Sequence, residues 1–216
     1  MPVITIARET GAGGTDVGRL LAEHLGAELV DGSLIDEVAR RLELAREEVE
    51  SRDEQPRSLV ERLLRGMAMA EGPIGVGASV GAAVPADSHT AITTLTAQVI
   101  REAARSGNAV IVGRGGCFVL AHWPQATHVF LCAPVEVRVR RLTALWAVDE
   151  ATANHRLLAD DARRRAYVRD VHGCEWRDPL NYHLAIDTGR VSFEEAAGLI
   201  AALATGRAAW PDVRAG

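Results

Sequence analysis

Residues 2–15 read PVITIARETGAGGT, and this stretch decides the fold. Its first six residues are mostly apolar or β-branched and too few for a helix, so they predict a strand. The glycine-rich residues 9–15 follow at once, and residues 16–25 then repeat apolar side chains at helical spacing up to Gly26, a typical helix end. A strand, a glycine loop and a helix in this order gather backbone N–H groups at the positive end of a helix dipole, which is an arrangement that binds phosphate.

The rest of the chain alternates apolar runs with helical patterns. An unbroken apolar strand such as residues 109–112 is expected where helices cover both faces of a sheet. Strands that alternate with helices predict a parallel sheet with right-handed crossovers, here in a single α/β domain over residues 1–216. We expect strands at 28–30, 109–112, 127–132 and 184–186, and helices after Ser33 and at 88–105, 135–146 (with Pro134 at position N1), 149–171 and 192–203.

Composition narrows the classes of function. The hydrophobic fraction of 48% and the charged fraction of 25% are those of an ordinary globular protein. Neither a membrane span nor a signal peptide is expected, because no run of 18 apolar residues occurs and no basic segment precedes the first apolar one, so a cytoplasmic location is the default. A net charge of −5 argues against a nucleic-acid partner, and the three cysteines lack the spacing of a disulfide framework or a zinc site. The sequence leaves open whether the chain forms a homodimer.

Residues 8–15 match the common phosphate-loop motif, G-x-x-x-x-G-K-[ST], only in part. Gly13 and Thr15 hold their places, so the Thr15 hydroxyl is a candidate ligand for Mg²⁺. Arg8 stands where the motif has its first glycine, and Gly14 stands where it has its lysine. An ordinary strand-to-helix turn remains an alternative for the loop taken alone, but its place directly after the first strand favours a phosphate loop.

Every basic residue of the chain is an arginine, since all 24 Lys+Arg residues are Arg. Any cationic contact with phosphate must therefore come from a guanidinium group. Arg8 is the natural replacement for the missing lysine, because phosphoryl transfer needs positive charge against the phosphoryl oxygens. Its guanidinium group is planar and lies at the other end of the loop, so it would approach the phosphates from a different side than the motif lysine does.

Candidate ligand-binding residues follow the strands, where open parallel sheets bind their ligands. Arg114, between glycines after strand 109–112, either binds an anion or decorates a tight turn. Asp31 either meets a ligand or caps the next helix. The arginine run at 163–165 either forms a solvated face or sends one or two side chains to a ligand, because at 100° per residue three neighbours cannot all point one way.

Several blocks of the chain together resemble the cytidylate kinase-like proteins, a divergent branch of the P-loop nucleoside-monophosphate kinases. The blocks are IARETGAGG at 6–14, LVD at 29–31, VIVGRG at 110–115, RAY at 165–167 and EWRDPLNY at 175–182. The resemblance implies a P-loop NTPase fold with three α/β/α layers around a parallel central sheet. It also implies a helical nucleoside-monophosphate-binding insertion at about 43–106, with a flexible loop or linker at 72–87, and an arginine-rich lid at about 149–180.

The same resemblance implies transfer of a phosphoryl group from ATP to CMP or dCMP with Mg²⁺, and roles for residues that match the family pattern. The ATP phosphates would be held by Thr10, Gly11, Ala12, Gly13, Gly14 and Thr15. The acceptor would be bound by Asp31, Ser33 and Arg114. The catalytic arginines would be Arg8, Arg163, Arg165 and Arg169.

Two positions depart from the cytidylate kinase pattern. Gly14 replaces the loop lysine, and Gly115 replaces the acidic residue that follows the arginine matching Arg114. Three hypotheses therefore stand: a nucleoside-monophosphate kinase, a nucleotide-binding regulatory protein that has lost efficient turnover, and a kinase for another small molecule.

Overall fold

The computed structural model describes residues 2–32 and 88–207 of the 216-residue chain. Five parallel strands form one sheet in the order β2-β3-β1-β4-β5. The strands are β1 (Val3–Arg8), β2 (Glu28–Val30), β3 (Ala109–Val112), β4 (Ala126–Cys132) and β5 (Leu184–Asp187). The chain order reverses between β1 and β3, and such a switch point is where open parallel sheets leave a crevice for ligands.

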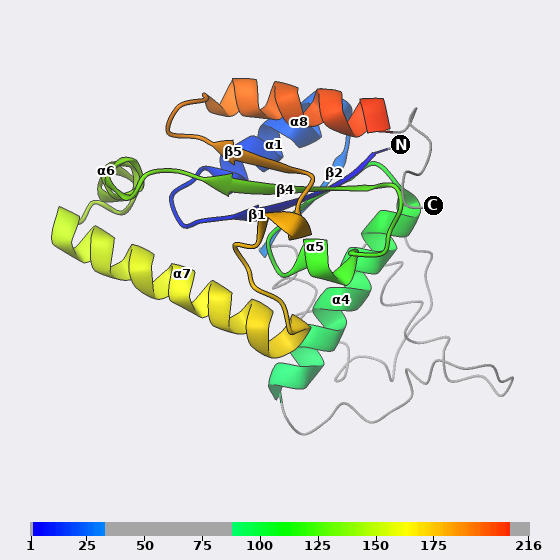
Figure 1. The fold of residues 1–216 in the computed structure, drawn as a ribbon, viewed down its shortest axis with the longest axis horizontal. Helices are drawn as coiled ribbons and strands as arrows, with labels where there is room; N and C mark the ends of the chain where they lie inside the picture. Colours follow the sequence, from blue (N-terminus) through cyan, green and yellow to red (C-terminus); the bar gives the residue numbers. More distant parts are fainter. Residues whose placement is uncertain (1, 33–87, 208–216) are drawn as a thin grey trace, which may run out of the picture.

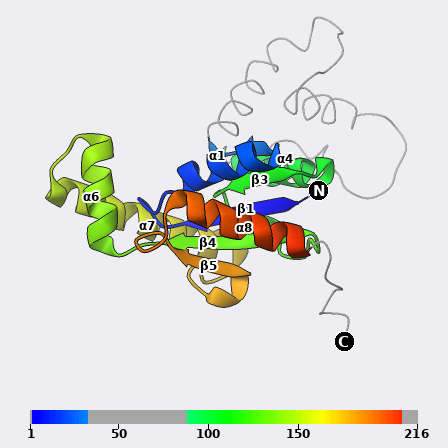
Figure 2. The same cartoon turned by 90° about the horizontal axis from the view of Figure 1, so that it is seen from above.

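Helices cover both faces of the sheet, which gives the three predicted layers (Figures 1 and 2). Helices α1 and α8 pack together on one face, and α4 and α5 lie on the other, while α6 and α7 project from one side (Figure 1). The helices are α1 (Gly14–Leu25), α4 (Ser88–Ser106), α5 (Gly116–Val119), α6 (Val135–Trp146), α7 (Glu150–His172) and α8 (Phe193–Arg207), with a 3-10 turn, η2 (Pro179–Asn181).

The alternation of side chains along β1 divides the core in two. Ile4 and Ile6 join the apolar cluster under α1 and α8, whereas Val3 joins the cluster under α4 and α5. Both sets are almost fully buried, because successive side chains of a strand point to opposite faces and both faces are covered. The central strand thus holds the first βα junction rigidly between two packed layers.

The predicted elements are confirmed within the described residues, with small differences at their ends. Pro134 is the N-cap of α6 and not its N1 residue, since its carbonyl already accepts the amides of Val137 and Arg138. Helix α8 continues to Arg207, four residues beyond the predicted end, and the short helix α5 was not predicted. The predicted insertion at about 43–106 is described only from residue 88, as α4, and the loop at 72–87 and the helix after Ser33 lie outside the described residues.

The start of α8 offers a test of local stability. Ser192 Oγ accepts the amide of Glu195, and the Glu195 carboxylate accepts the amide of Ser192, which together form a capping box. We expect Ser192→Ala to lower the free energy of unfolding by about 1 kcal/mol, measured by urea unfolding. Ser106→Ala, at a helix C-terminal end, is the control, and an equal loss in the two variants would contradict this role for Ser192.

Candidate active site

The glycine loop, residues 9–15, joins β1 to α1 in a conformation that needs glycine. Gly11 and Gly13 have φ angles of 82° and 79°, in the left-handed region that other residues rarely adopt. Gly13 is also the N-cap of α1, so the amides of Gly14 and Thr15 open the helix and lack an intrahelical acceptor. The loop therefore presents N–H groups at the positive end of the helix dipole, as phosphate binding requires.

The carbonyl groups of the loop are held from the other side. Thr10 O accepts from Arg138 Nη1 at 3.3 Å, and Ala12 O accepts from Thr188 Oγ1 at 3.1 Å. Gly11 O accepts from Arg141 Nη1 at 3.3 Å. These bonds come from α6 and from the segment after β5, and they turn the negative ends of the peptide groups towards the protein body.

Two amides of the glycine loop, at residues predicted to hold phosphate, already have partners within the protein. The amide of Thr10 donates to Asp161 Oδ1 at 2.9 Å, and the amide of Ala12 donates to Glu9 O at 3.1 Å. Both amides are thus used inside the protein, which the local sequence could not reveal because Asp161 lies 151 residues away. The amides of Gly11, Gly13, Gly14 and Thr15 have no bond of this kind among the described residues.

Arg8 occupies the space that a side chain at position 14 would need. A Cβ atom built on Gly14 would overlap Cγ of Arg8, and one built on Gly113 would overlap the Arg8 guanidinium. The Arg8 side chain therefore runs across Gly14 and reaches the end of β3. The glycine at the lysine position is explained by this packing, and the two departures from the motif compensate for each other.

The electrostatic environment of Arg8 is unusual for a buried cation. Burial, followed by the positive charges of Arg164 and Arg114, lowers its pKa to about 10, and Asp31 offsets part of this effect. Arg8 still carries its charge at neutral pH. Three guanidinium groups that repel one another are stabilised by any anion that binds among them.

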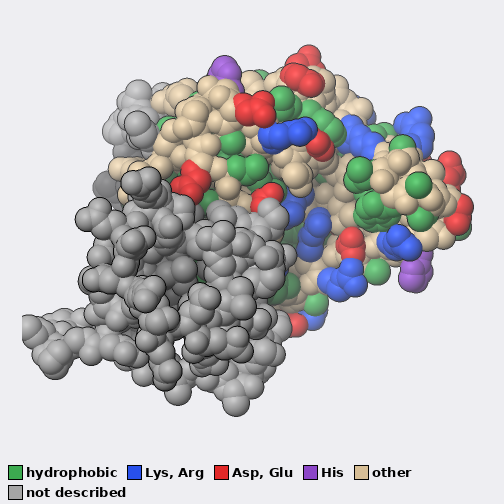
Figure 3. All heavy atoms as spheres, turned by 180° about the vertical axis from the view of Figure 1, so that it is seen from behind, with side chains coloured by type: hydrophobic (Ala, Val, Ile, Leu, Met, Phe, Trp, Pro, Cys, Tyr) green, Lys and Arg blue, Asp and Glu red, His purple; other side chains and the backbone are tan. Residues whose placement is uncertain are grey.

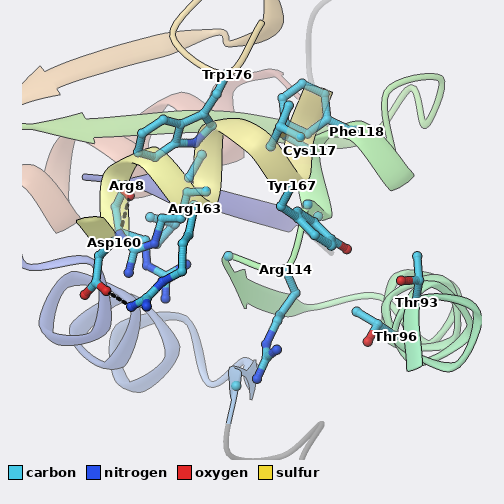
Figure 4. A pocket seen from close by; sticks show the side chains of 18 residues that line it. Arg8, Thr93, Thr96, Arg114, Cys117, Phe118, Asp160, Arg163, Tyr167 and Trp176 are labelled. Atoms are coloured by element: carbon cyan, nitrogen blue, oxygen red, sulfur yellow. Dashed lines mark hydrogen bonds and ion pairs between the residues drawn. The ribbon is translucent and has the colours of Figure 1, made fainter. Parts of the chain in front are cut away.

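A cavity of about 570 Å³ opens at the carboxyl ends of β1 and β3, and we call it the arginine cavity (Figure 4). Its volume is in the range of small-molecule sites. The lining brings together four arginines, two threonine side chains of α4 and an aromatic wall, and Thr93 and Thr96 lie across the cavity from Arg163 in Figure 4. These residues are Arg8, Arg114, Arg163, Arg164, Thr93, Thr96, Phe118, Tyr167 and Trp176. The space-filling view from behind shows several arginine side chains on the surface, interspersed with acidic ones (Figure 3).

Arg114 reaches the cavity from a strained turn. Its φ is 53°, between Gly113 at 77° and Gly115 at 71°, so three successive residues adopt positive φ. A non-glycine residue in this region costs about 1–2 kcal/mol, and such strain concentrates at functional sites. Packing also favours glycine at position 115, because a Cβ atom there would lie 2.5 Å from Nε2 of His172. A side chain at this position would require the His172 ring to move.

Only part of the arginine run on α7 faces the cavity. Arg163 and Arg164 line it, and Arg163 pairs with Asp160 (Figure 4). Arg165 and Arg169 do not line it, and their side chains lie next to Glu175 at 3.6 Å and Asp170 at 3.1 Å. This division follows from helix geometry, which turns neighbouring residues 100° apart.

The remaining predicted ligand-binding residues are placed as follows. Asp31 lies close enough to raise the pKa of Arg8, and neighbouring Gly32 lines the cavity against Arg114. Ser33 lies outside the described residues. Thr15 is exposed on the first turn of α1, where its hydroxyl fits the role of a Mg²⁺ ligand beside bound phosphates. Among the described residues no group of three or more His, Cys, Asp or Glu side chains could hold a metal, and no helix is long and apolar enough to cross a membrane.

Sequence reasoning missed the parts of the site that come from distant elements. Thr96 is buried on α4, and Trp176 after α7 also lines the arginine cavity. Four charged residues behind the glycine loop were missed as well: Glu9, Arg138, Asp161 and Arg177. For one of the four, Asp161, helical spacing could have predicted burial, because Asp161 falls on the same face of α7 as the apolar residues Leu157 and Val168.

The sheet order and the glycine loop at the first βα junction define an α/β fold of the P-loop kinase type. The chain belongs to the cytidylate kinase-like family, whose model matches residues 3–190. It is similar to a cytidylate kinase of Methanopyrus kandleri, with 27% identity over 211 residues that cover 93% of this chain and 91% of that protein.

Solved structures share the fold. An uncharacterised protein from Eubacterium ventriosum superposes with a TM-score of 0.69 at 23% identity, over 95% of this chain and 99% of that one. The YorR protein of Bacillus subtilis, in complex with phosphorylated GDP, gives a TM-score of 0.51 at 14% identity, over 97% and 99% of the two chains. A shikimate kinase from Bacteroides thetaiotaomicron gives 0.50 at 15% identity, over 94% and 97%. At these identities the likeness concerns the fold alone.

The packing of Arg8 on Gly14 predicts that the motif lysine cannot simply be restored. We expect Gly14→Lys to lower the free energy of unfolding by about 1–3 kcal/mol, because the new side chain overlaps the Arg8 stem. The double variant Arg8→Gly/Gly14→Lys has the full G-x-x-x-x-G-K-T motif, and we expect it to recover most of that loss in urea unfolding.

The control for this experiment is Gly198→Lys on α8. A Cβ at Gly198 meets nothing within 4 Å, so this substitution adds the same side chain to a helix without overlap. We expect it to be neutral or slightly stabilising. If Gly14→Lys were as stable as Gly198→Lys, Arg8 would have to move aside freely, and the compensation would be refuted.

Proposed function

We propose that this chain is a kinase that transfers the γ-phosphoryl group of ATP to a nucleoside monophosphate, with CMP and dCMP as the first acceptors to test. Its family and its fold support a phosphotransferase. The observation that carries the proposal is the convergence of Arg8, Arg114, Arg163 and Arg164 on one cavity next to the glycine loop. Phosphoryl transfer needs this arrangement, because catalysis depends on positioning and on stabilising charge at the phosphoryl oxygens.

The donor side is the glycine loop. The amides of Gly11, Gly13, Gly14 and Thr15 hold the phosphates of ATP, since they have no bond of this kind among the described residues. Mg²⁺ bound beside the Thr15 hydroxyl supplies neutralisation of phosphate charge. Arg8 provides the cation that the motif lysine provides elsewhere, and its stem packed on Gly14 keeps the guanidinium fixed.

The acceptor side is the arginine cavity. Arg114 binds the phosphate of the acceptor, which accounts for the strain of its backbone. Arg164 and Arg163 reach the group being transferred from α7, in the role that the sequence assigned to Arg163, Arg165 and Arg169. The wall of Phe118, Tyr167 and Trp176 receives the apolar part of the acceptor. No covalent intermediate is required.

One observation favours a second candidate, a nucleotide-binding protein without efficient turnover. The Arg8 guanidinium lies against Gly113 at the end of β3, so it is directed away from the end of the loop where the motif lysine stands. A third candidate, a kinase for another small molecule, rests on Gly115, which replaces the acidic residue of the cytidylate kinase pattern and packs against His172.

Turnover assays separate the three candidates. ADP release is followed in a coupled assay with ATP, Mg²⁺ and each of CMP, dCMP, UMP, AMP and GMP. Turnover with any of them supports the proposal. Thermal stabilisation by ATP without turnover supports the nucleotide-binding protein. Phosphorylation of a compound in a metabolite pool, when every monophosphate fails, supports the kinase for another small molecule.

Arg8 is the first residue to test by substitution. We expect Arg8→Ala to weaken ATP affinity or turnover by about tenfold or more, since a lost charge-assisted contact corresponds to roughly 1.4 kcal/mol. Arg105→Ala removes an arginine that is 64% exposed on α4, far from the arginine cavity, and serves as the control. Unchanged steady-state kinetics and ATP affinity in Arg8→Ala would remove Arg8 from the mechanism.

Neighbouring arginines on α7 give a matched comparison. We expect Arg164→Gln to reduce kcat/KM by about tenfold or more, because Arg164 lines the cavity and a transition-state contact of a guanidinium is lost. We expect Arg165→Gln to have less than about a twofold effect, since its side chain pairs with exposed Glu175. Equal losses would return Arg165 to the catalytic set.

A further inference from the structure

One face of α7 is apolar except at its centre. Ala153, Leu157, Asp161 and Val168 are its buried residues, and half-buried Arg164 falls on the same face. They recur every three or four residues, which places them in one stripe along the helix. A leucine at position 161 would complete the stripe. A carboxylate there costs free energy unless every oxygen is paired, so its presence calls for a reason beyond packing.

Asp161 is fully paired, and its partners belong to the glycine loop. Oδ1 accepts the amide of Thr10 at 2.9 Å, and Oδ2 accepts from Arg138 Nη1 at 2.7 Å. Arg138 is 3% exposed and also donates to Thr10 O at 3.3 Å and to Ala133 O at 2.9 Å. The pair thus holds both the N–H and the C=O of one loop residue.

Glu9 and Arg177 complete a balanced set of two carboxylates and two guanidinium groups, which we call the charge network. Glu9 Oε1 lies 2.6 Å from Arg177 Nη2, and Glu9 Oε2 lies 3.4 Å from Arg138 Nε. Arg177 Nη2 lies 3.4 Å from Asp161 Oδ2. The network links the loop, α6, α7 and the segment after α7.

One turn further along the same face, Arg164 donates to Arg8 O at 2.9 Å. Helix α7 therefore makes hydrogen bonds to the backbone of residues 8–10 from two positions, Asp161 and Arg164, which lie three residues apart. Arg164 also lines the arginine cavity. These two hydrogen bonds couple the position of α7 to that of the glycine loop.

We propose that Asp161 is a positioning residue that fixes the glycine loop in its phosphate-binding conformation and, through α7, sets Arg164 relative to that loop. The inference rests on the ATP-binding half of the proposed function. Asp161 does not touch the nucleotide. It acts through the amide of Thr10 and through Arg138. A hydrophobic residue at position 161 would hold neither peptide group and would leave buried Arg138 without this carboxylate.

Asp161→Asn tests the role with little change of volume. The amide oxygen can still accept from Thr10, but the NH₂ group faces Arg138, a donor opposite a donor. We expect ATP affinity, measured by titration calorimetry, to fall by about tenfold or more. We also expect hydrogen exchange to rise by a similar factor at the amides of Glu9, Thr10 and Ala12, which are hydrogen-bonded in the free protein. Asp170→Asn is the matched control, because it makes the same change on the same helix where the side chain is 64% exposed.

A second variant separates positioning from stability. Asp161→Asn/Arg138→Gln removes both partners, so its thermal midpoint is expected to return towards wild type. We expect its ATP affinity and loop exchange to stay altered, because the Thr10 peptide group has lost both charged partners. If ATP affinity recovers together with the midpoint, Asp161 is merely structural and the proposal is overturned. If Asp161→Asn alone does not fold, the double variant carries the comparison.

The outcomes are distinct from those of the proposed function. Should wild-type protein fail to bind ATP, the donor half of that function fails, and loop exchange in the free variants still decides whether Asp161 fixes the loop. Should ATP bind without phosphoryl transfer, both readouts remain valid. Loop exchange and ATP affinity equal to those of Asp170→Asn would refute the positioning role.

Discussion

The site depends on the direction of the peptide groups in the glycine loop. A carbonyl oxygen aimed at a phosphate repels it, so an anion site of this kind requires the carbonyls to be held elsewhere. Here Arg138, Arg141 and Thr188 hold three successive carbonyls, and they come from α6 and from the segment after β5. The amides then open α1 at the positive end of its dipole. The loop is shaped by long-range contacts as much as by its glycines.

The motif has glycine at position 8 and lysine at position 14, whereas this chain has Arg8 and Gly14. The packing of these two residues shows why both positions change together. A lysine side chain and the Arg8 stem compete for the same volume, so only one can be present in this backbone. Replacing the lysine by an arginine six residues earlier keeps a positive charge near the phosphates but brings it in along β1, towards β3. Arg8 then lies between the glycine loop and the arginine cavity, where burial, followed by the charges of Arg164 and Arg114, lowers its pKa. In the reaction that we propose, the donor and acceptor sides would use Arg8 as a common cation.

Local sequence predicted the elements well, because strands buried on both faces and helices with one apolar face have distinct periodicities. The strand, glycine loop and helix over 3–25 needed no other information. The pairing of distant charges could not be predicted in the same way. Glu9 and Asp161 are far apart in the chain, and nothing in the spacing around Glu9 indicates that it is buried against Arg138. The positive φ of Arg114 was likewise hidden, since its glycine neighbours allow several turn conformations.

The charge network shows what an arginine can do at a buried position where a lysine could not. Arg138 bridges three acceptors from different segments, Asp161 Oδ2, Thr10 O and Ala133 O, while it is 3% exposed. A guanidinium can do this because it has five N–H donors in a fixed plane, whereas an ammonium is a compact point charge that is harder to desolvate. A buried cation that orients several backbone groups is therefore better served by the fixed fork of an arginine. The flexible ammonium of a lysine suits a contact with phosphate that must adjust. The chain therefore uses arginine for two purposes. Arg138 and Arg141 hold the backbone of the glycine loop from behind, and other arginines line the cavity in front of it.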